Sequence, residues 1–327
     1  MVDEPPEEYS TQRYLAAKRT VDDRALNERV FRDAMAFLSD RDLPARVIEV
    51  AAGVGTMLER LLDRDTLPVD VEYTMLDVDP ANVAAAERRL PDHARSLGYT
   101  VETHAGPSPN GAFRASAPSF AVTLSGPDRR VRLRAGTADA FPFAAQADRT
   151  WDLLVAGAFL DIVPGSDRLA SLFELVPGGG YYAPISFDGA TRFVPAVDRL
   201  FDRRLERRWH AGMRTGDDPN DPRAGSQVPV WVEEAGGAVE SVGGSSWVVR
   251  PETGPGRNGY PADEAYFLFH VLRFVEESLT RDSELDGERV RDWVADRRTR
   301  VVDADLRYVA HNLDAFGRVD SPRDGLV

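Results

Sequence analysis

The stretch Glu49-Val-Ala-Ala-Gly-Val-Gly-Thr56 decides the fold of this chain. An apolar run at 47–50 precedes the glycines and a helical pattern at 57–62 follows them, so a strand, a glycine turn and a helix are predicted. A second predicted strand, 71–77, ends in Asp77. Glycine is needed where the backbone turns sharply beside a ligand, and an acid after the next strand can accept hydrogen bonds from ribose hydroxyls. Together they predict a nucleoside-bearing cofactor.

The acid Glu49, just ahead of the glycines, narrows the choice of cofactor. A nicotinamide or flavin fingerprint has a third glycine where this chain has Leu58. The two negative charges of a pyrophosphate also disfavour a neighbouring carboxylate, whereas an amine or a sulfonium benefits from one. S-adenosylmethionine carries both cations and no phosphate. We therefore expect Glu49, Gly53 and Gly55 to contact S-adenosylmethionine.

Five segments in order make the chain resemble the class I S-adenosylmethionine-dependent methyltransferases. They are the first motif Glu49-x-x-x-Gly53-x-Gly55, the ribose acid Asp77, the adenine segment 136–143, the fourth strand 151–155 and the glycine turn 177–182 before the fifth strand. Ala51 stands where the family often has another glycine, and its small side chain still fits. The resemblance implies a Rossmann-like fold that transfers a methyl group and leaves S-adenosylhomocysteine.

The resemblance also implies which residues bind the cofactor. It places Asp77 and Val78 at the ribose, Ala138 and Asp139 at the adenine, and Ala156 and Phe159 near the methionine moiety and the acceptor. The family's adenine acid often follows the glycine directly, where this chain has Thr137. Either Asp139 binds the adenine amine, or Thr137 and the backbone of Ala138 do. Phe159 fits a core position equally well.

The N-terminal segment 14–27 is dense in polar residues for a helix. In the family such segments often lie over the cofactor, and Lys18, Arg19 or Arg24 would then bind its carboxylate. Of these we assign Arg24 to the cofactor site. A solvated, charged helix is the alternative.

Four residues are candidates for the general base that some acceptors require. Asp161 follows the fourth predicted strand, where it is either a base or a helix cap, and Asp188 follows the fifth. His210 comes after an arginine-rich helix, and His311 ends the last predicted strand, 306–311. No metal site is expected, because the chain has no cysteine and its histidines are scattered.

Composition limits the class of partner and the compartment. The 327 residues carry a net charge of −14, which disfavours binding to nucleic acid or to an anionic membrane. Lys18 is the only lysine, and acidity with so little lysine fits a salt-adapted, halophilic source as well as an ordinary GC-rich one. Without a long apolar run or a signal-peptide pattern, we expect a cytoplasmic protein with no membrane contact. The oligomeric state stays open.

The order of predicted elements gives the domain organisation. Strands alternate with helices, which predicts an α/β fold with a doubly wound, mostly parallel sheet, seven-stranded as in the family. We expect a disordered stretch at 1–10, a helical cap at 11–40, a Rossmann-like domain at 41–320 and a tail at 321–327. Within the domain, residues 98–135 read as a strand insertion with a β-hairpin, 120–124 and 130–134.

The expected function is methyl transfer from S-adenosylmethionine to an O, N or C nucleophile of a small molecule. No basic groove and no motif for a DNA, RNA or protein acceptor is present. Three alternatives stay open: an aminopropyl transferase, an NAD-dependent oxidoreductase on a similar fold, and a non-catalytic protein that binds S-adenosylmethionine.

Overall fold

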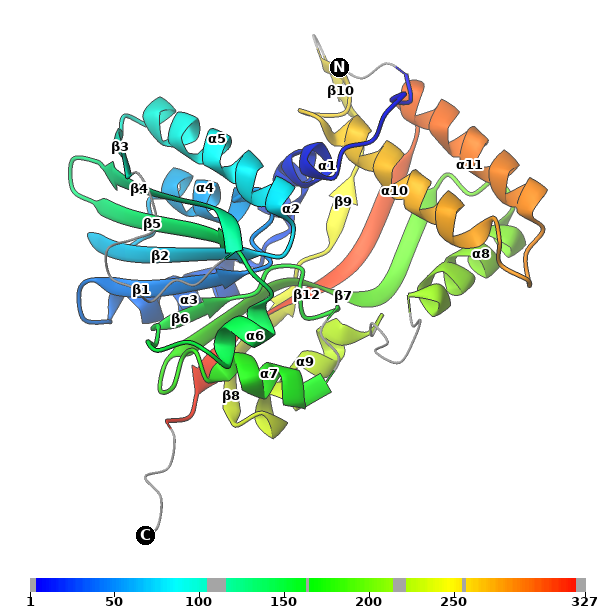
Figure 1. Cartoon of the computed structure of the whole chain (residues 1–327). Coiled ribbons are helices and arrows are strands. Elements are labelled where there is room, and N and C mark those ends of the chain that lie inside the picture. The colour runs from blue at the N-terminus through cyan, green and yellow to red at the C-terminus, as the bar shows by residue number, and fades with distance from the viewer. Residues whose placement is uncertain (1–3, 105–115, 163–164, 214–221, 255–256, 322–327) are drawn as a thin grey trace.

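One mixed sheet of ten strands organises the chain (Figure 1). The computed structural model describes residues 4–104, 116–162, 165–213, 222–254 and 257–321. Residues 1–3 of the expected disordered stretch and 322–327 of the expected tail lie outside these ranges. The strands are β1 Ala45–Val50, β2 Asp70–Asp77, β3 Thr100–His104, β4 Ser116–Ser125, β5 Arg130–Thr137, β6 Leu153–Val155, β7 Gly180–Val194, β8 Gly237–Gly244, β9 Trp247–Val249 and β12 Arg307–Val319. A separate hairpin pairs β10 Glu252–Gly254 with β11 Arg257–Gly259.

The strand order confirms a parallel centre with antiparallel strands from the C-terminal part of the chain. The order is β3-β4-β5-β2-β1-β6-β7-β12-β8, with β9 paired to β12. Strands β5, β2, β1, β6 and β7 are parallel neighbours, while β12 runs antiparallel to β7 and β8. The sheet is thus mixed and has ten strands, whereas a mostly parallel, seven-stranded sheet was expected. Parallel strands end at one edge, so the segments after β1, β6 and β2 meet there.

The hairpin near the middle of the chain is real, but its role in the sheet differs from the expected insertion at 98–135. Strands β3 and β4 extend the edge of the sheet by antiparallel pairing. The second arm, β5, instead pairs with β2 in parallel along its whole length and is a central strand. Alternation of side chains predicts a hairpin, but it cannot show which neighbour a strand's other edge will pair with.

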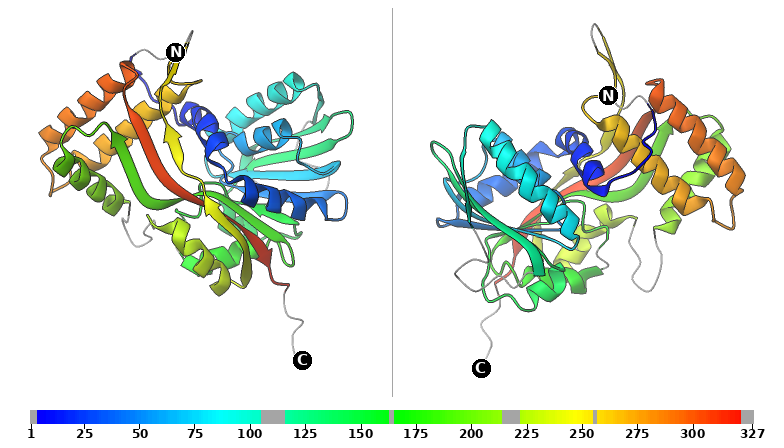
Figure 2. Two further views of the ribbon diagram at one scale, coloured as in Figure 1. Left: turned by 180° about the vertical axis from the view of Figure 1, so that it is seen from behind. Right: turned by 45° about the horizontal axis from the view of Figure 1, so that its top comes forward.

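Helices cover both faces of the sheet (Figures 1 and 2). Helices α3 Glu28–Ser39, α4 Thr56–Asp63 and α5 Pro80–Ser96 pack on one face, and α6 Ala140–Ala144, α7 Gly165–Phe173 and α9 Ala224–Glu234 pack on the other. Asp79 caps α5, as expected, because its side chain accepts a hydrogen bond from the Ala81 N–H, and Pro80 opens the helix. The chain therefore has a mixed α/β fold with helices on both faces of its sheet.

A third core lies beyond the sheet. Strands β7 and β12 extend beyond the ends of the central strands. There they pack against α8 Arg199–Gly212, α10 Glu264–Leu279 and α11 Gly287–Val302 (Figure 1). Both strands are longer than the sequence indicates. In β7, Gly189 takes a φ of +74° at an irregularity that lets the strand continue past Asp188. In β12, the buried polar residues Asn312 and Asp314 interrupt the apolar alternation.

The helical pattern at 11–38 forms three helices rather than one. Helices α1 Thr11–Ala17 and α2 Arg19–Ala25 are followed by a break at Leu26, and Asn27 then caps α3. Ahead of α1, the Ser10 N–H donates to the Tyr266 hydroxyl at 2.6 Å, which ties this end of the chain to α10. Helices α1 and α2 lie between the sheet and the third core (Figure 2). No helix within the described ranges is long and apolar enough to cross a membrane.

Candidate functional site

A cavity of about 270 Å³ lies where the central strands end. Its walls come from the glycine turn after β1, the loop after β6, the middle of β7, helices α1 and α2, and the start of β9. The polar residues that line it are Tyr14, Lys18, Asp22, Glu49, Thr56, Arg60, Asp161 and Trp247. Open α/β sheets bind ligands at this edge, so the cavity is the candidate site.

The glycine turn is held in place by Asp77. Gly53 and Gly55 have φ values of +56° and +85°, which glycine adopts without strain. The Gly53 N–H donates to Oδ2 of Asp77 at 2.7 Å, and the Asp79 N–H and the Asn82 amide donate to Oδ1 at 2.9 and 3.1 Å. A carboxylate accepts about four hydrogen bonds. One further bond, for example from a ribose hydroxyl, can therefore be added without breaking these three.

Strained backbone gathers at this cavity. Ala51, Ala158 and Ile185 line it, and all three have positive φ, at +50°, +50° and +61°. This conformation is rare for residues other than glycine and is a true outlier for a β-branched residue. Ile185 is held there because its N–H donates to the buried Asp314 at 2.8 Å. Such strain costs about 1–3 kcal/mol per residue and clusters at functional sites.

Glu49 is a buried acid at the cavity wall. It is 4% exposed, and its Oε2 accepts a hydrogen bond from the Tyr73 hydroxyl at 2.8 Å. Burial raises the pKa of Glu49 to about 8, against the opposing effects of Tyr73 and Arg60. The carboxyl group is therefore mostly protonated at neutral pH. A cation that enters the cavity would favour the ionised carboxylate and pair with it.

Arg60, on α4, is a cavity residue that sequence patterns did not single out. It is 3% exposed, and its Nε donates to Asp23. Its Nη2 is shielded from solvent and has no hydrogen-bond partner among the described residues. A buried cationic donor without a partner is costly, which suits it to bind a carboxylate in the cavity. Glu49 and Arg60 together match the ammonium and carboxylate of an amino-acid moiety.

Asp161 lines the cavity from the loop after β6. Helix α7 begins at Gly165, so Asp161 lies too early in the chain to be its N-cap. Its Oδ1 is shielded from solvent and has no partner within the described part of the chain. Burial raises the pKa of Asp161 to about 6, although its own backbone N–H and Lys18 act in the opposite direction.

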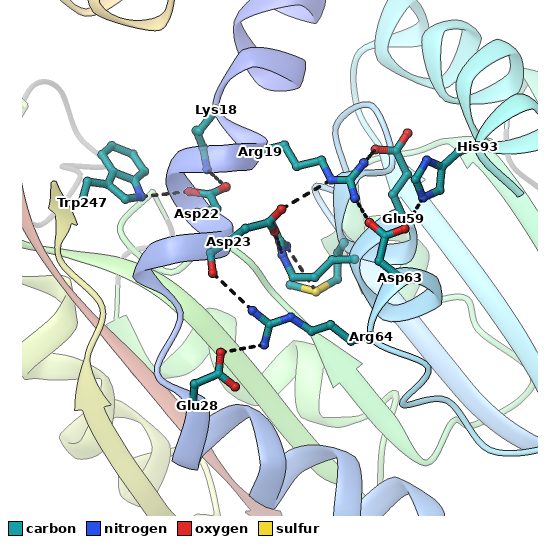
Figure 3. Close-up of polar contacts among 12 residues, drawn as sticks. Lys18, Arg19, Asp22, Asp23, Glu28, Glu59, Asp63, Arg64, His93 and Trp247 are labelled. Atoms are coloured by element: carbon teal, nitrogen blue, oxygen red, sulfur yellow. Dashed lines mark hydrogen bonds and ion pairs between the residues drawn. The ribbon is translucent and has the colours of Figure 1, made fainter. Parts of the chain in front are cut away.

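The N-terminal helices form the roof of the cavity, and whether they lie over a cofactor stays a prediction. Lys18 Nζ contacts Asp22 at 2.9 Å, and the Trp247 indole N–H donates to the other oxygen of Asp22 at 2.8 Å (Figure 3). Leu15 lies over the glycine turn, 3.2 Å from where a Cβ on Gly53 would stand. At the ribose corner, the Gln12 amide donates to Asn82 at 2.9 Å.

Ion pairs clamp this lid onto α4 and α5 (Figure 3). Arg19 donates to Glu59 at 2.8 Å and also pairs with Asp63. Glu59 is 2% exposed and receives a second guanidinium from Arg89 at 3.0 Å, while His93 contacts Asp63 at 2.8 Å. Arg19 thus points away from the cavity. The lid position depends on charges from three helices.

Removing the central cation of this clamp should loosen the lid. In Arg19→Gln, Glu59 keeps Arg89, so we expect a loss of about 1–2 kcal/mol in unfolding free energy and a several-fold faster release of whatever fills the cavity. Arg95→Gln is the matched control, because Arg95 is half exposed on α5 and, among the described residues, pairs only with the exposed Asp92. Denaturant unfolding and ligand dissociation rates measure both effects. Equal rates in the two variants would contradict the clamp.

The cavity brings together only part of the expected cofactor site. Glu49, Ala51 and Gly53 line it. Asp77 does not line it, but accepts a hydrogen bond from the Gly53 N–H. The expected residues that do not line it are Arg24, Gly55, Val78, Ala138, Asp139, Ala156 and Phe159. Arg24 pairs with the buried Glu264, and Asp139 caps α6 through the Phe141 N–H at 3.0 Å. The adenosine contacts therefore stay predictions, outside this cavity.

The remaining base candidates lie apart from the cavity. His311 contacts Ser246 at 2.9 Å, and its Nε2 is 3.8 Å from Asp188, which caps the start of α9 through the Ser226 N–H. His210 contacts Thr191 at 2.9 Å. Burial, with Arg192 nearby, lowers the pKa of His210 to about 4, so this histidine is neutral at physiological pH. No group of three or more His, Asp or Glu within the described ranges could hold a metal ion.

Several cavity residues carry no local sequence signal. Trp247 and Ile185 stand in ordinary strand patterns, and Asp22 looks like any surface acid of a charged helix. Only the fold brings these segments together. Lys18 had a usable signal, because it is the single lysine among many arginines.

Comparison with known proteins finds similarity to solved structures only, at low identity and low TM-score. No protein-family model and no curated protein matches the chain. The solved structures similar to it along its length include several described as methyltransferases. Haemonchus contortus phosphoethanolamine N-methyltransferase 2, bound to phosphomonomethylethanolamine and S-adenosylhomocysteine, is 10% identical, with a TM-score of 0.40, over 97% of this chain and 61% of its own. This chain thus spans about three fifths of that enzyme.

A second structure matches at full length on both sides. It is an S-adenosylmethionine-dependent methyltransferase from Thiobacillus denitrificans in complex with S-adenosylhomocysteine, which is 13% identical, with a TM-score of 0.42, over 95% of this chain and 98% of its own. At these values the similarity identifies neither a cofactor nor an acceptor for this chain.

Proposed function

We propose that this protein transfers a methyl group from S-adenosylmethionine to a nucleophile of a small molecule. One observation carries the proposal: a single cavity at the carboxyl end of the parallel strands joins Glu49 and the glycine turn to Asp161. Strained backbone at Ala51, Ala158 and Ile185 marks the same place. Backbone strain and a buried acid cost stability, and their presence together at one cavity suits a bound substrate.

The charged groups of the cavity fit the amino-acid part of this cofactor. Glu49 is suited to its ammonium group, and the partnerless Nη2 of Arg60 is suited to its carboxylate. The small size of the cavity, about 270 Å³, is consistent with this part of the cofactor lying inside and the adenosine outside. Bound there, the cofactor supplies an activated methyl group, and the residues of the chain orient it and exclude water.

The polar wall also favours an enzyme over a protein that only binds the cofactor. A closed, apolar surface would suffice for storage of a ligand. Instead Asp161, Tyr14, Lys18 and Asp22 face the same space. An acceptor of limited size fits a cavity covered by α1 and α2, and the net charge of −14 disfavours nucleic acid as the acceptor.

Binding measurements test the proposal. We expect S-adenosylmethionine and S-adenosylhomocysteine to bind in titration calorimetry at least a hundredfold more tightly than NAD. Decarboxylated S-adenosylmethionine, the donor of an aminopropyl transferase, lacks the carboxylate and should bind about tenfold more weakly or worse. Arg318→Gln, far from the cavity on β12, is the control. Preference for NAD or for the decarboxylated donor would refute methyl transfer.

A further inference from the structure

The cavity holds two separate sets of charged groups. Glu49 and Arg60, from β1 and α4, are complementary to an amino-acid moiety. The second set comes from the loop after β6 and from the lid, and consists of Asp161, Lys18 and Asp22. The cofactor's amino acid accounts for the first set, so the second is left to recognise something else.

The second set has an excess negative charge. Lys18 and Asp22 form an ion pair at 2.9 Å and cancel each other. Asp161 has no ion pair within the described residues, and its shielded Oδ1 has no hydrogen-bond partner there. Asp161 is partly exposed as a residue, but a shielded carboxylate oxygen without a partner is costly, and a cation that binds beside it removes that cost. An anion would face both Asp161 and Asp22.

Resting on the methyl transfer proposed above, we propose that the acceptor is an amine that enters as its ammonium ion, binds Asp161 and gives its proton to Oδ1 of that residue. One N–H bond breaks and the proton forms an O–H bond with Asp161. The freed lone pair forms a bond to the methyl carbon while the carbon–sulfur bond breaks. The sulfur keeps that electron pair and becomes a neutral thioether, and the positive charge passes to the methylated nitrogen.

Proton affinity separates amines from alcohols as acceptors. Burial raises the pKa of Asp161 to about 6. An ammonium like that of lysine, with a pKa of about 10.4, would pass its proton to such a carboxylate in roughly one complex in 10⁴. A hydroxyl with the acidity of water, about 15.7, would do so in roughly one in 10¹⁰. Asp161 is an adequate base for an amine and a very poor one for an alcohol.

The titratable groups around Asp161 set its response to pH. The lid contributes Tyr14, Lys18 and Asp22, and the β1–α4 wall contributes Glu49 and Arg60. Tyr14 and Asp161 line the same cavity, and burial, Asp22 and Asp161 together raise the pKa of Tyr14. Because Asp161 must be ionised to bind an ammonium ion, amine affinity should fall about tenfold per pH unit below pH 6.

A matched set of probes tests the inference in the protein saturated with S-adenosylhomocysteine. The probes are methylamine, ethylamine and phenethylamine, with 2-phenylethanol and 3-phenylpropionate as the neutral and anionic counterparts. We expect at least one amine to bind tenfold more tightly than both counterparts at pH 7.5, by ligand-observed NMR or calorimetry. If no amine binds, or if 2-phenylethanol binds as tightly as phenethylamine, the inference is wrong.

Two variants locate the effect. Asp161→Asn should abolish the amine preference and leave the affinity for S-adenosylhomocysteine within about threefold, while Asp167→Asn, an exposed acid on α7, should change neither. Asp161 would serve the cofactor's sulfonium instead if Asp161→Asn weakened S-adenosylmethionine relative to S-adenosylhomocysteine and spared the amine. If Asp161→Asn does not fold, a pH-independent amine affinity of the unaltered protein between pH 5 and 7 still overturns the inference. Failure of S-adenosylhomocysteine itself to bind refutes the proposed function, a separate outcome.

Discussion

Glu49→Gln should make the ligand-free protein more stable at pH 8 while it weakens cofactor binding. Burial raises the pKa of Glu49 to about 8 in the folded protein, from an ordinary value of 4.5. Between these values the folded state keeps a proton that the unfolded state has lost. Glu49 therefore lowers stability as pH rises from about 5 to 8, by about 1.4 kcal/mol per pH unit at most. Glutamine is neutral at every pH and removes this slope.

The measurement compares unfolding free energies by denaturant titration at pH 5 and pH 8. We expect the two proteins to be similar at pH 5, and the variant to be more stable by about 3 kcal/mol at pH 8. Tyr73→Phe is the matched variant, because it removes the hydrogen bond that favours the ionised carboxylate and should steepen the loss. A Glu49→Gln protein with the unaltered slope would show that Glu49 is ionised in the ligand-free fold.

The same substitution should cost cofactor affinity about 10- to 100-fold, because a charge-assisted hydrogen bond contributes about 1.5–3 kcal/mol. In the unaltered protein, a bound ammonium group must draw Glu49 into its ionised form. Binding of S-adenosylhomocysteine should therefore release a proton near pH 7, which calorimetry in buffers of different ionisation enthalpy detects. Glu49→Gln should bind weakly and release no proton from this site.

The glycine turn and the parallel centre of the sheet were predictable from sequence because their signals are local. The helical pattern at 57–62 becomes helix α4, Thr56–Asp63, since Gly55 supplies a left-handed turn and an amphipathic pattern follows. The cap at Asp79 is equally local. The burial of Glu49 was also predictable, because it lies inside an apolar strand, where a charged residue needs partners.

The parts that sequence patterns missed depend on contacts between distant segments. The cavity needs Asp22, Trp247 and Ile185 to meet, and the hydrogen bond between the first two spans 225 positions. The left-handed backbone of Ile185 cannot be predicted from sequence, because β-branched residues rarely adopt it. It exists because Asp314, far along the chain, accepts a hydrogen bond from the Ile185 N–H. Arg60 resembled one more polar residue of an amphipathic helix.

Asp77 has a structural task besides the cofactor contact that is predicted for it. The sequence assigns it to a ribose, yet three hydrogen bonds from Gly53, Asp79 and Asn82 already converge on its carboxylate. Asp77 is 7% exposed, so little water could replace it. Its removal would leave the N–H of Gly53 buried and unpaired, and the glycine turn would lose its fixed distance from β2.

Asp77→Ala should therefore lower both stability and cofactor affinity. Each lost charge-assisted bond contributes about 1.5–3 kcal/mol, and one buried donor left unpaired costs about 1–3 kcal/mol. We expect a loss of at least 3 kcal/mol in unfolding free energy and more than a hundredfold in affinity for S-adenosylhomocysteine, measured by calorimetry at a temperature where the variant is folded. Unchanged affinity in the folded variant would refute both tasks.

Asp77→Asn separates the two tasks. The amide offers one oxygen, so it can accept from Gly53 or from Asp79 but must turn its NH₂ group towards the other donor. Stability should fall by less than in Asp77→Ala. If Asp77 acts only by holding the glycine turn, affinity will follow stability across the two variants. If it also binds ribose hydroxyls, the loss of negative charge in Asp77→Asn will weaken S-adenosylhomocysteine binding beyond what the stability of the variant predicts. Methionine has no ribose and will then bind the Asp77→Asn variant and the unaltered protein alike.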